Sequence, residues 1–254
     1  MMSTLTRSTA SSAMYKAPTP ASRVSARRRV AVTLADGTSR DGTFVSQLRR
    51  RTMDLHTKSQ APKEGKVDNP ESFELFNPTR EGFMRFMVES RIVYQAFEDV
   101  VHHAPCHAFY ARLADTGLER SMALTQDINH MRRHWGVDVP RPSPDLGLAY
   151  AELIMDVAAN NPPAFVCHYY NHYFAHAAGG RIVGKKVRES LLDGWTGEFY
   201  QWDGDVCDLV GNVRDIIEDV ALGWAPAEKQ ACLMETPVAF RWGTTMLSLI
   251  TQQN

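Results

Sequence analysis

The chain has 254 residues, of which 44% are apolar and 22% charged, a composition typical of a globular domain with its own hydrophobic core. The formal net charge is −1, yet residues 1–30 contain six basic residues and no acidic one, so the remaining residues sum to −7. This acidic balance argues against a nucleic-acid-binding protein. No stretch of about 18 consecutive apolar residues occurs, so we expect no membrane-spanning helix.

Residues 1–30 are rich in Ser, Thr, Ala and Arg, and they lack the continuous apolar segment of a secretory signal. This composition is typical of an organelle transit peptide, although an untargeted disordered tail would look similar. We therefore predict a disordered transit peptide over 1–30, a flexible segment over 31–42 and one domain over 43–252. The four cysteines form no C-x-x-C pair, which favours a reducing compartment over a disulfide framework or a zinc knuckle.

The pattern of apolar residues in the rest of the chain is helical. In chain order it predicts a helix over 43–60, a proline-containing loop over 61–82, a long amphipathic helix from Gly82 to His103, and one or two helices over 107–134. After a second proline-rich loop it predicts helices over about 146–158, 164–190 and 205–222, and a last helix from Pro226 to about Ile250. A strand-like pattern occurs only in RVAVTLA, near residue 30. The sequence thus predicts one all-α, multi-helix domain.

His56 lies on the apolar face of the first predicted helix, and Arg49 lies two turns earlier on the same face. Two helical turns correspond to about 10 Å. A flat, anionic iron cofactor such as heme would fit this pair, because imidazole ligates iron and guanidinium binds a propionate. A lone histidine on a helix is more often an ordinary polar residue, so the pair alone leaves both interpretations open.

Three histidines at a spacing of four residues, His168, His172 and His176, share one face of the predicted 164–190 helix, and Gly179 and Gly180 continue this face. Each glycine inside a helix costs about 1 kcal/mol relative to alanine, which indicates a close approach to a bulky planar ligand or a bend. A zinc site and a half-buried polar stripe are the alternatives. No Glu-x-x-His motif accompanies the stripe, which argues against a carboxylate-bridged metal enzyme.

Two long segments, LRRRTMDLHTKSQAPKEG and YNHYFAHAAGGRIVGKKV, resemble the proximal-helix and distal-helix motifs of the plastid branch of the heme oxygenase family. Three further segments and the region around Phe240 resemble the same family: TGLERSMALTQDI (116–128), PAFVCHYYNHYFAH (163–176) and EFYQWDGD (198–205). The resemblance covers about residues 43–250. It implies a fold with heme between a proximal and a distal helix, and oxidative cleavage of heme to biliverdin, CO and ferrous iron with O2.

The resemblance implies four residues that bind heme b, which would be both substrate and cofactor. His56 matches the proximal ligand of the heme iron, and Arg49 matches a basic residue that pairs with a propionate. Tyr170 matches a tyrosine near the propionates, and Phe240 matches an aromatic wall of the pocket. A hydrogen-bond acceptor should fix the second ring nitrogen of His56, but the sequence does not identify one.

The resemblance also implies a distal, catalytic set. Gly179 and Gly180 match the glycines that lie over the heme, while His176 and His172 match polar positions that anchor a network of water. Animal members have Asp where this chain has His176, which leaves the identity of the anchor open.

No G-x-G-x-x-G motif occurs, so we expect electrons to come from outside the chain. The resemblance implies reduced ferredoxin as the donor and biliverdin that feeds bilin synthesis in the chloroplast stroma. The basic run after the glycines is the candidate dock for this acidic protein, with a solvated helix face as the alternative; its members are Arg181, Lys185, Lys186 and Arg188. We expect a monomer that binds heme and O2 and no nucleic acid.

The plastid family also contains a branch that lacks the proximal histidine and is thought not to turn heme over. The presence of His56 favours the active branch. The alternative function is a non-catalytic heme-binding, bilin-binding or regulatory protein on the same fold.

Overall fold

The computed structural model describes residues 42–56, 77–103 and 107–251. Within these ranges all regular secondary structure is helical, which confirms the predicted all-α class. The predicted transit peptide over 1–30, nearly all of the segment 31–42, the RVAVTLA stretch and most of the predicted loop 61–82 lie outside the described residues. None of the described helices is both long enough and apolar enough to cross a membrane.

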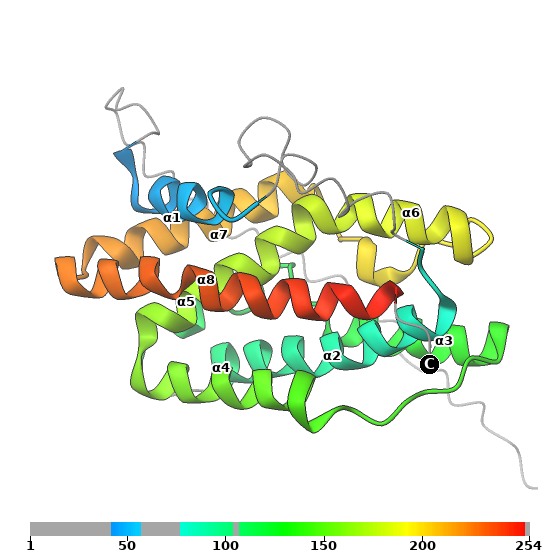
Figure 1. Ribbon diagram of the computed structural model, residues 1–254. Helices are drawn as coiled ribbons and strands as arrows, with labels where there is room; N and C mark the ends of the chain where they lie inside the picture. Colours follow the sequence, from blue (N-terminus) through cyan, green and yellow to red (C-terminus); the bar gives the residue numbers. More distant parts are fainter. Residues whose placement is uncertain (1–41, 57–76, 104–106, 252–254) are drawn as a thin grey trace, which may run out of the picture. The chain divides into compact units, whose positions relative to one another are not determined.

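Eight α-helices and five shorter helical turns follow one another in the described ranges (Figure 1). The α-helices are α1 (Phe44–Met53), α2 (Arg80–His103), α3 (Ser121–Trp135), α4 (Ala149–Asn160), α5 (Pro162–Ala175), α6 (Arg181–Leu191), α7 (Val206–Leu222) and α8 (Pro226–Ser248). The 3-10 turns are η2 (Tyr110–Leu113), η5 (Glu198–Tyr200) and η6 (Leu249–Thr251), and the π-helical turns are η3 (Pro144–Leu148) and η4 (His176–Gly180).

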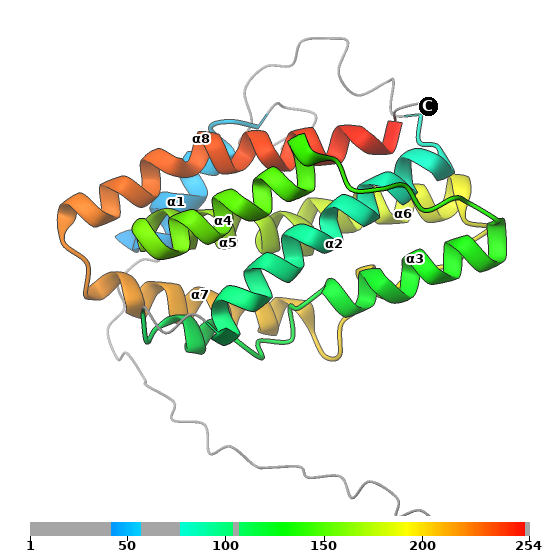
Figure 2. The same ribbon diagram turned by 90° about the horizontal axis from the view of Figure 1, so that it is seen from below.

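Helices α5 and α8 pack along each other, and α2 packs against both α3 and α4, as the turned view shows (Figure 2). Helix α1 rests on α8 and α7. The interface between α2 and α5 is aromatic: Phe97 meets the rings of Phe165 and Tyr169 edge to face, at centroid distances of 5.7 and 5.8 Å. Edge-to-face pairs add directional stabilisation to burial, so this interface fixes how α5 is rotated about its axis.

Two of the predicted helices differ from the structure: one is shorter, and the other is divided into two helices. The first helix ends at Met53, because the chain tightens into 3-10 turns over residues 54–56, and residues 57–60 of the predicted helix lie outside the described residues. The predicted 164–190 helix is divided by the π-helical turn η4 into α5 and α6. The prolines at 162 and 163 begin α5, and the side chain of Asn161 caps it by accepting a hydrogen bond from the backbone N–H of Ala164.

Carboxylates on the helices hold the connecting segments by accepting two backbone N–H groups each. Glu218 of α7 accepts from Phe44 and Val45 at 2.7 and 2.8 Å, and so fixes the start of α1. Three buried carboxylates do the same elsewhere: Glu89 for Ser143 and Gly147, Glu98 for Arg120 and Ser121, and Asp127 for Glu198 and Phe199. These paired hydrogen bonds satisfy donors at helix starts that have no partner within the helix.

We predict that Glu218→Ala lowers the free energy of unfolding by about 1–3 kcal/mol, because two N–H groups at the start of α1 lose a charged acceptor. Urea denaturation followed by circular dichroism would measure the change. Asp215→Ala is the matched control, since Asp215 is exposed on the same helix and is expected to change stability by less than about 0.5 kcal/mol. Equal effects of the two substitutions would contradict this role of Glu218.

Candidate functional site

The geometry at the end of α1 explains how the His56 ring is oriented. In a continuing α-helix the backbone N–H of His56 would bind the carbonyl of Thr52. Here that N–H donates instead to the carbonyl of Met53, at 3.1 Å. The Thr52 carbonyl accepts the Leu55 N–H at 3.1 Å, and its second lone pair remains for the side chain of His56, whose Nδ1 lies 2.9 Å from it.

A carbonyl oxygen can only accept a hydrogen bond, so this contact requires the Nδ1–H form of the His56 ring. The lone pair of the other nitrogen, Nε2, is then available to a metal ion. The ring is half-buried, and the Phe240 ring meets it at a centroid distance of 4.9 Å and an angle of 72°. The structure thus brings together two residues that the sequence placed in the same site and supplies the acceptor that it left unidentified.

The last turn of α1 is tied to α5 through two buried side chains that sequence reasoning missed. The hydroxyl of Thr52 lies 2.8 Å from Asn171 Oδ1, and the amide of Asn171 donates to the carbonyl of Cys167 at 2.9 Å. This chain of contacts fixes the turn that carries His56 relative to α5. A threonine on the apolar face of the first helix was the only signal of it in the sequence.

A second part of the site gathers two guanidinium groups around a buried phenol. Tyr170 of α5 is 5% exposed, and burial raises its pKa to about 12, while the positive charges of Arg214 and Arg49 act in the opposite direction. Helices α1 and α5 are joined next to Tyr170 by the Thr52–Asn171 contact, and α7 reaches Tyr170 through Phe174, whose ring lies 4.2 Å from the Tyr170 ring. Arg214 also lies over the Phe174 ring, 5.9 Å from its centroid. Sequence reasoning found Arg49 and Tyr170 but missed Arg214, which lies within the segment 205–222 that was predicted only as a helix.

The end of α5 and the π-helical turn η4 together form an exposed face made of small residues. Ala175, Ala178 and Gly179 are exposed, and a Cβ atom added to Gly179 would meet no other atom within 4 Å. A Cβ on Gly180, in contrast, would lie 3.0 Å from His176 Nδ1. The expectation that both glycines continue the histidine face is therefore wrong for Gly179: a π-helical turn has more residues per turn, which rotates Gly179 outward and leaves Gly180 beside His176.

The three histidines of the stripe point inward and have separate surroundings. His168 is fully buried, with the Tyr150 hydroxyl 3.0 Å from Nδ1 and Glu235 Oε1 3.0 Å from Nε2. His172 packs on the Tyr94 ring at 4.5 Å, and its buried Nε2 has no hydrogen-bond partner. In the described part of the chain, no three His, Cys, Asp or Glu side chains are grouped so that they could hold a metal ion.

His176 is held by the 3-10 turn η5. Its Nε2–H donates to the carbonyl of Phe199 at 2.8 Å, and its ring stacks on the Phe199 ring at a centroid distance of 3.9 Å. Burial lowers the pKa of His176 to about 3, and burial likewise lowers the pKa of His172 to about 3. Both imidazoles are therefore neutral at physiological pH.

Comparison with known proteins identifies this arrangement. The family model for heme oxygenase matches residues 42–247. The chain belongs to the heme oxygenase family. It is 40% identical to heme oxygenase 1, chloroplastic, of Arabidopsis thaliana over 211 residues, which cover 82% of this chain and 73% of that protein. It is 34% identical to the probable inactive heme oxygenase 2, chloroplastic, of Arabidopsis thaliana, over 70% of this chain and 58% of that protein.

The fold agrees with solved heme oxygenase structures. Heme oxygenase-1 from the cyanobacterium Synechocystis, in complex with heme, superposes with a TM-score of 0.64 at 22% identity, over 81% of this chain and 91% of that one. Heme oxygenase 2 from Chlamydomonas reinhardtii, solved without heme, gives a TM-score of 0.57 at 18% identity, over 66% of this chain and 82% of that one. These matches establish the heme oxygenase fold.

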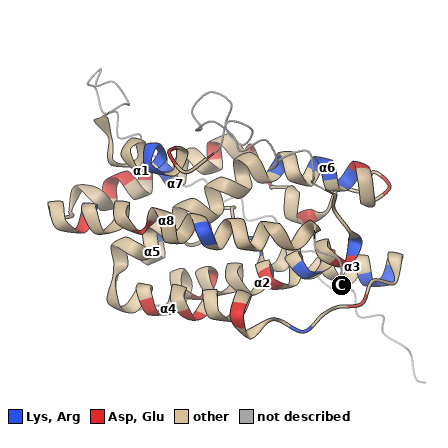
Figure 3. Cartoon of the chain, viewed as in Figure 1, with Lys and Arg blue, Asp and Glu red and all other residues tan. Residues whose placement is uncertain are grey.

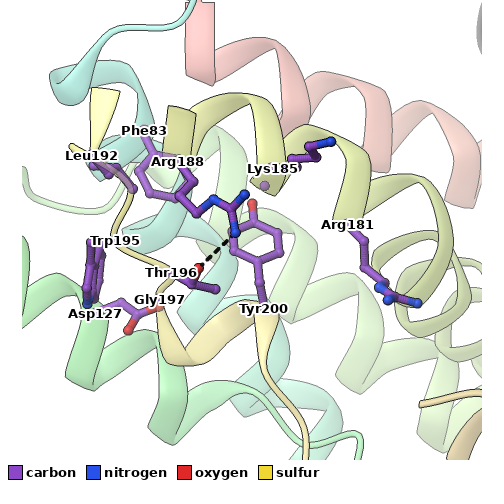
Figure 4. Close-up of a pocket in the computed structure, with 11 residues that line it drawn as sticks. Phe83, Asp127, Arg181, Lys185, Arg188, Leu192, Trp195, Thr196, Gly197 and Tyr200 are labelled. Carbon is purple, nitrogen blue, oxygen red and sulfur yellow. Dashed lines mark hydrogen bonds between the residues drawn. The ribbon is translucent and has the colours of Figure 1, made fainter. Parts of the chain in front are cut away.

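The predicted docking residues of this heme oxygenase lie on α6, and Figure 3 shows Lys and Arg positions distributed along this helix. Three of them, Arg181, Lys185 and Arg188, line a cavity of about 140 Å³ between α6 and the segment that ends in η5. Figure 4 shows that Arg188 reaches into this cavity, where it donates to the Thr196 hydroxyl at 3.3 Å, whereas Arg181 and Lys185 point away from it. Lys186 is exposed outside the cavity lining.

Asp127 lines the same cavity, and burial raises its pKa from 3.8 to about 6 in spite of two backbone hydrogen bonds that stabilise its charge. A raised pKa means that folding favours the protonated form, so Asp127 contributes stability that appears as the pH falls below about 6.

We predict that lowering the pH from 7 to 4 raises the free energy of unfolding of the wild type by about 2 kcal/mol more than it raises that of Asp127→Asn. Denaturant titrations of both proteins across this range would measure it, and a difference independent of pH would contradict it.

Proposed function

We propose that this chain is a ferredoxin-dependent heme oxygenase of the plastid stroma, which cleaves heme b to biliverdin, CO and ferrous iron with O2. The observation that carries the proposal is the tautomer of the His56 ring, that is, which of its two nitrogens carries the proton. Its Nδ1–H is held by the Thr52 carbonyl, so that Nε2 is ready to ligate iron. Bound heme would supply both the iron that activates O2 and the ring that is cleaved.

The other residues near α1 and α5 fit heme as a ligand. Arg49 and Arg214 would bind the propionates, because guanidinium groups pair with carboxylates through charge-assisted hydrogen bonds. The Tyr170 hydroxyl, whose raised pKa keeps it protonated, can donate to the same carboxylates. Phe240 would form the apolar wall beside His56.

The small residues of α5 and η4 would let the helix backbone approach the flat face of the ring. Glycine at 179 leaves this approach open, since its position faces empty space. Behind this face, His176 has committed its Nε2–H to Phe199, so the nitrogen that it presents beside Gly180 is an unprotonated acceptor. His176 can hold a water molecule by accepting a hydrogen bond, and neither it nor His172 can act as a cationic acid at neutral pH.

A plastid location is supported by the chloroplastic heme oxygenases of Arabidopsis thaliana and Oryza sativa, at 40% and 39% identity, and by the predicted transit peptide. Ferredoxin as electron donor is supported by the basic face of α6. Ile182, which is 72% exposed between the charged residues, adds an apolar centre to this face. An apolar centre with a charged rim is typical of a protein-binding surface.

The alternative is a non-catalytic heme- or bilin-binding protein, and the similarity to the probable inactive heme oxygenase 2 proteins keeps it open. The two functions differ in one measurement. With hemin, O2 and reductant, an enzyme consumes the bound heme and its Soret band falls as a bilin band rises, whereas a carrier keeps its heme.

We predict that His56→Ala lowers heme turnover at least about 100-fold, because the iron loses its imidazole ligand, and that added imidazole restores part of the activity. Absorption spectra under reductant and O2 would measure turnover and ligation. His103→Ala is the matched control, since His103 also ends a helix with Nδ1 beside the carbonyl four residues earlier, at 3.2 Å, but is exposed. Turnover by His56→Ala at the wild-type rate would exclude His56 as the ligand.

We predict that Arg181→Glu combined with Lys185→Glu raises the KM for ferredoxin on the order of tenfold and weakens the rise of this KM with salt, because the opposite charges that steer the encounter, and that salt screens, are lost. Turnover with a small neutral reductant should not change. Arg132→Glu, on the exposed face of α3, is the charge-reversal control. Equal losses with ferredoxin and with the neutral reductant would refute this docking site.

A further inference from the structure

The turn η5 contacts His176 in two ways through a single residue. The Phe199 carbonyl accepts the Nε2–H of His176 at 2.8 Å, and the Phe199 ring stacks on the imidazole at an interplanar angle of 18°. A three-residue 3-10 turn has little internal hydrogen bonding of its own. The position of this carbonyl must therefore be set by other elements.

Two buried side chains at the start and in the N-terminal half of α3 hold η5: one binds backbone N–H groups and the other binds backbone carbonyls. Asp127 accepts the N–H groups of Glu198 and Phe199 at 2.8 and 2.9 Å. Arg120, at the start of α3, donates to the carbonyl of Glu198 at 3.3 Å and to that of Gln201. The N–H groups thus meet a carboxylate and the carbonyls meet a guanidinium, which fixes the turn along its hydrogen-bonding direction.

The Asp127 carboxylate lies so close to the backbone before η5 that no side chain fits between them. A Cβ atom added to Gly197, the residue before η5, would lie 2.2 Å from Asp127 Oδ2. The carboxylate therefore sits directly against the backbone and holds the two peptide groups that immediately precede the one carrying the Phe199 carbonyl, so a change at this carboxylate acts on that carbonyl through one intervening Cα atom.

We propose that Asp127 is a positioning residue for His176: by holding η5 it places the Phe199 carbonyl so that His176 keeps its proton on Nε2 and presents Nδ1 beside Gly180. Its importance for turnover rests on the function proposed above for His176, but the positioning itself is a property of the heme-free protein. Asp127 lies on a different helix from His176 and acts on it only through Phe199.

The test uses NMR of the full chain with isotope-labelled histidine, without heme, so that the ring nitrogens report the tautomer directly. The His176 signal is assigned by its loss in His176→Ala. In the wild type we expect the Nε2–H tautomer with slow exchange of that proton. In Asp127→Asn one of the two N–H groups of η5 faces the side-chain NH2 group of Asn instead of a carboxylate oxygen and loses its acceptor. We therefore expect the His176 Nε2–H to exchange on the order of tenfold faster and the Nδ1–H tautomer to become detectable.

Glu89→Gln is the matched control. Glu89 is also buried and also accepts two backbone N–H groups, but they belong to Ser143 and Gly147, which do not contact His176. We expect Glu89→Gln to leave the His176 signal unchanged even where it lowers the melting temperature as much as Asp127→Asn does.

An unchanged His176 signal in Asp127→Asn, alongside lowered stability, would overturn the proposal and leave Asp127 a structural residue. Equal changes of the signal in both variants would overturn it as well. Heme turnover measured on the same samples separates the two claims. A wild type with a fixed His176 Nε2–H tautomer that does not consume heme would refute the enzymatic function and not the positioning. A wild type that consumes heme, with an unchanged His176 signal in Asp127→Asn, would refute the positioning and not the enzymatic function.

Discussion

Two backbone carbonyls decide how the two sides of this site present their nitrogen atoms. Because a carbonyl can only accept, Thr52 requires the proton of His56 to be on Nδ1, and Phe199 requires the proton of His176 to be on Nε2. The first choice leaves the Nε2 lone pair of His56 available for the iron of the proposed heme, and the second leaves the Nδ1 lone pair of His176 available to accept a hydrogen bond. The helices, their capping carboxylates and the aromatic interface between α2 and α5 serve to keep these two carbonyls in place.

The fold was largely predictable because it depends on periodicity. The apolar spacing in the segments that became α2 and α7 marks helices whatever their partners are, and Pro226 is an ordinary signal of a helix start for α8. The ends of α1 and α5 were not predictable in this way. Their sequences continue a helical pattern, and only the final hydrogen bonds show that the backbone tightens at Asp54 and widens at His176.

Candidate site residues could be chosen from the sequence where a residue type limits the chemistry. Imidazole, guanidinium and paired glycines have few uses, so His56, Arg49 and Gly179 could be singled out, and the resemblance to heme oxygenases gave them roles. Thr52, Asn171, Arg214 and Asp127 were not found, because each matters through a partner more than 40 positions away in the sequence or through a main-chain atom. A single sequence carries no record of such pairs.

Gly179 shows that the demands of folding and of ligand binding diverge at one position. Since a methyl group there would touch nothing, the protein alone would accept alanine and would gain up to about 1 kcal/mol of helix stability from it. The fold therefore does not require glycine at this position, and in the proposed function it is the heme lying over this face that would require it. Residue 179 is a place where selection for a more stable molecule would act against the surface that makes the molecule useful.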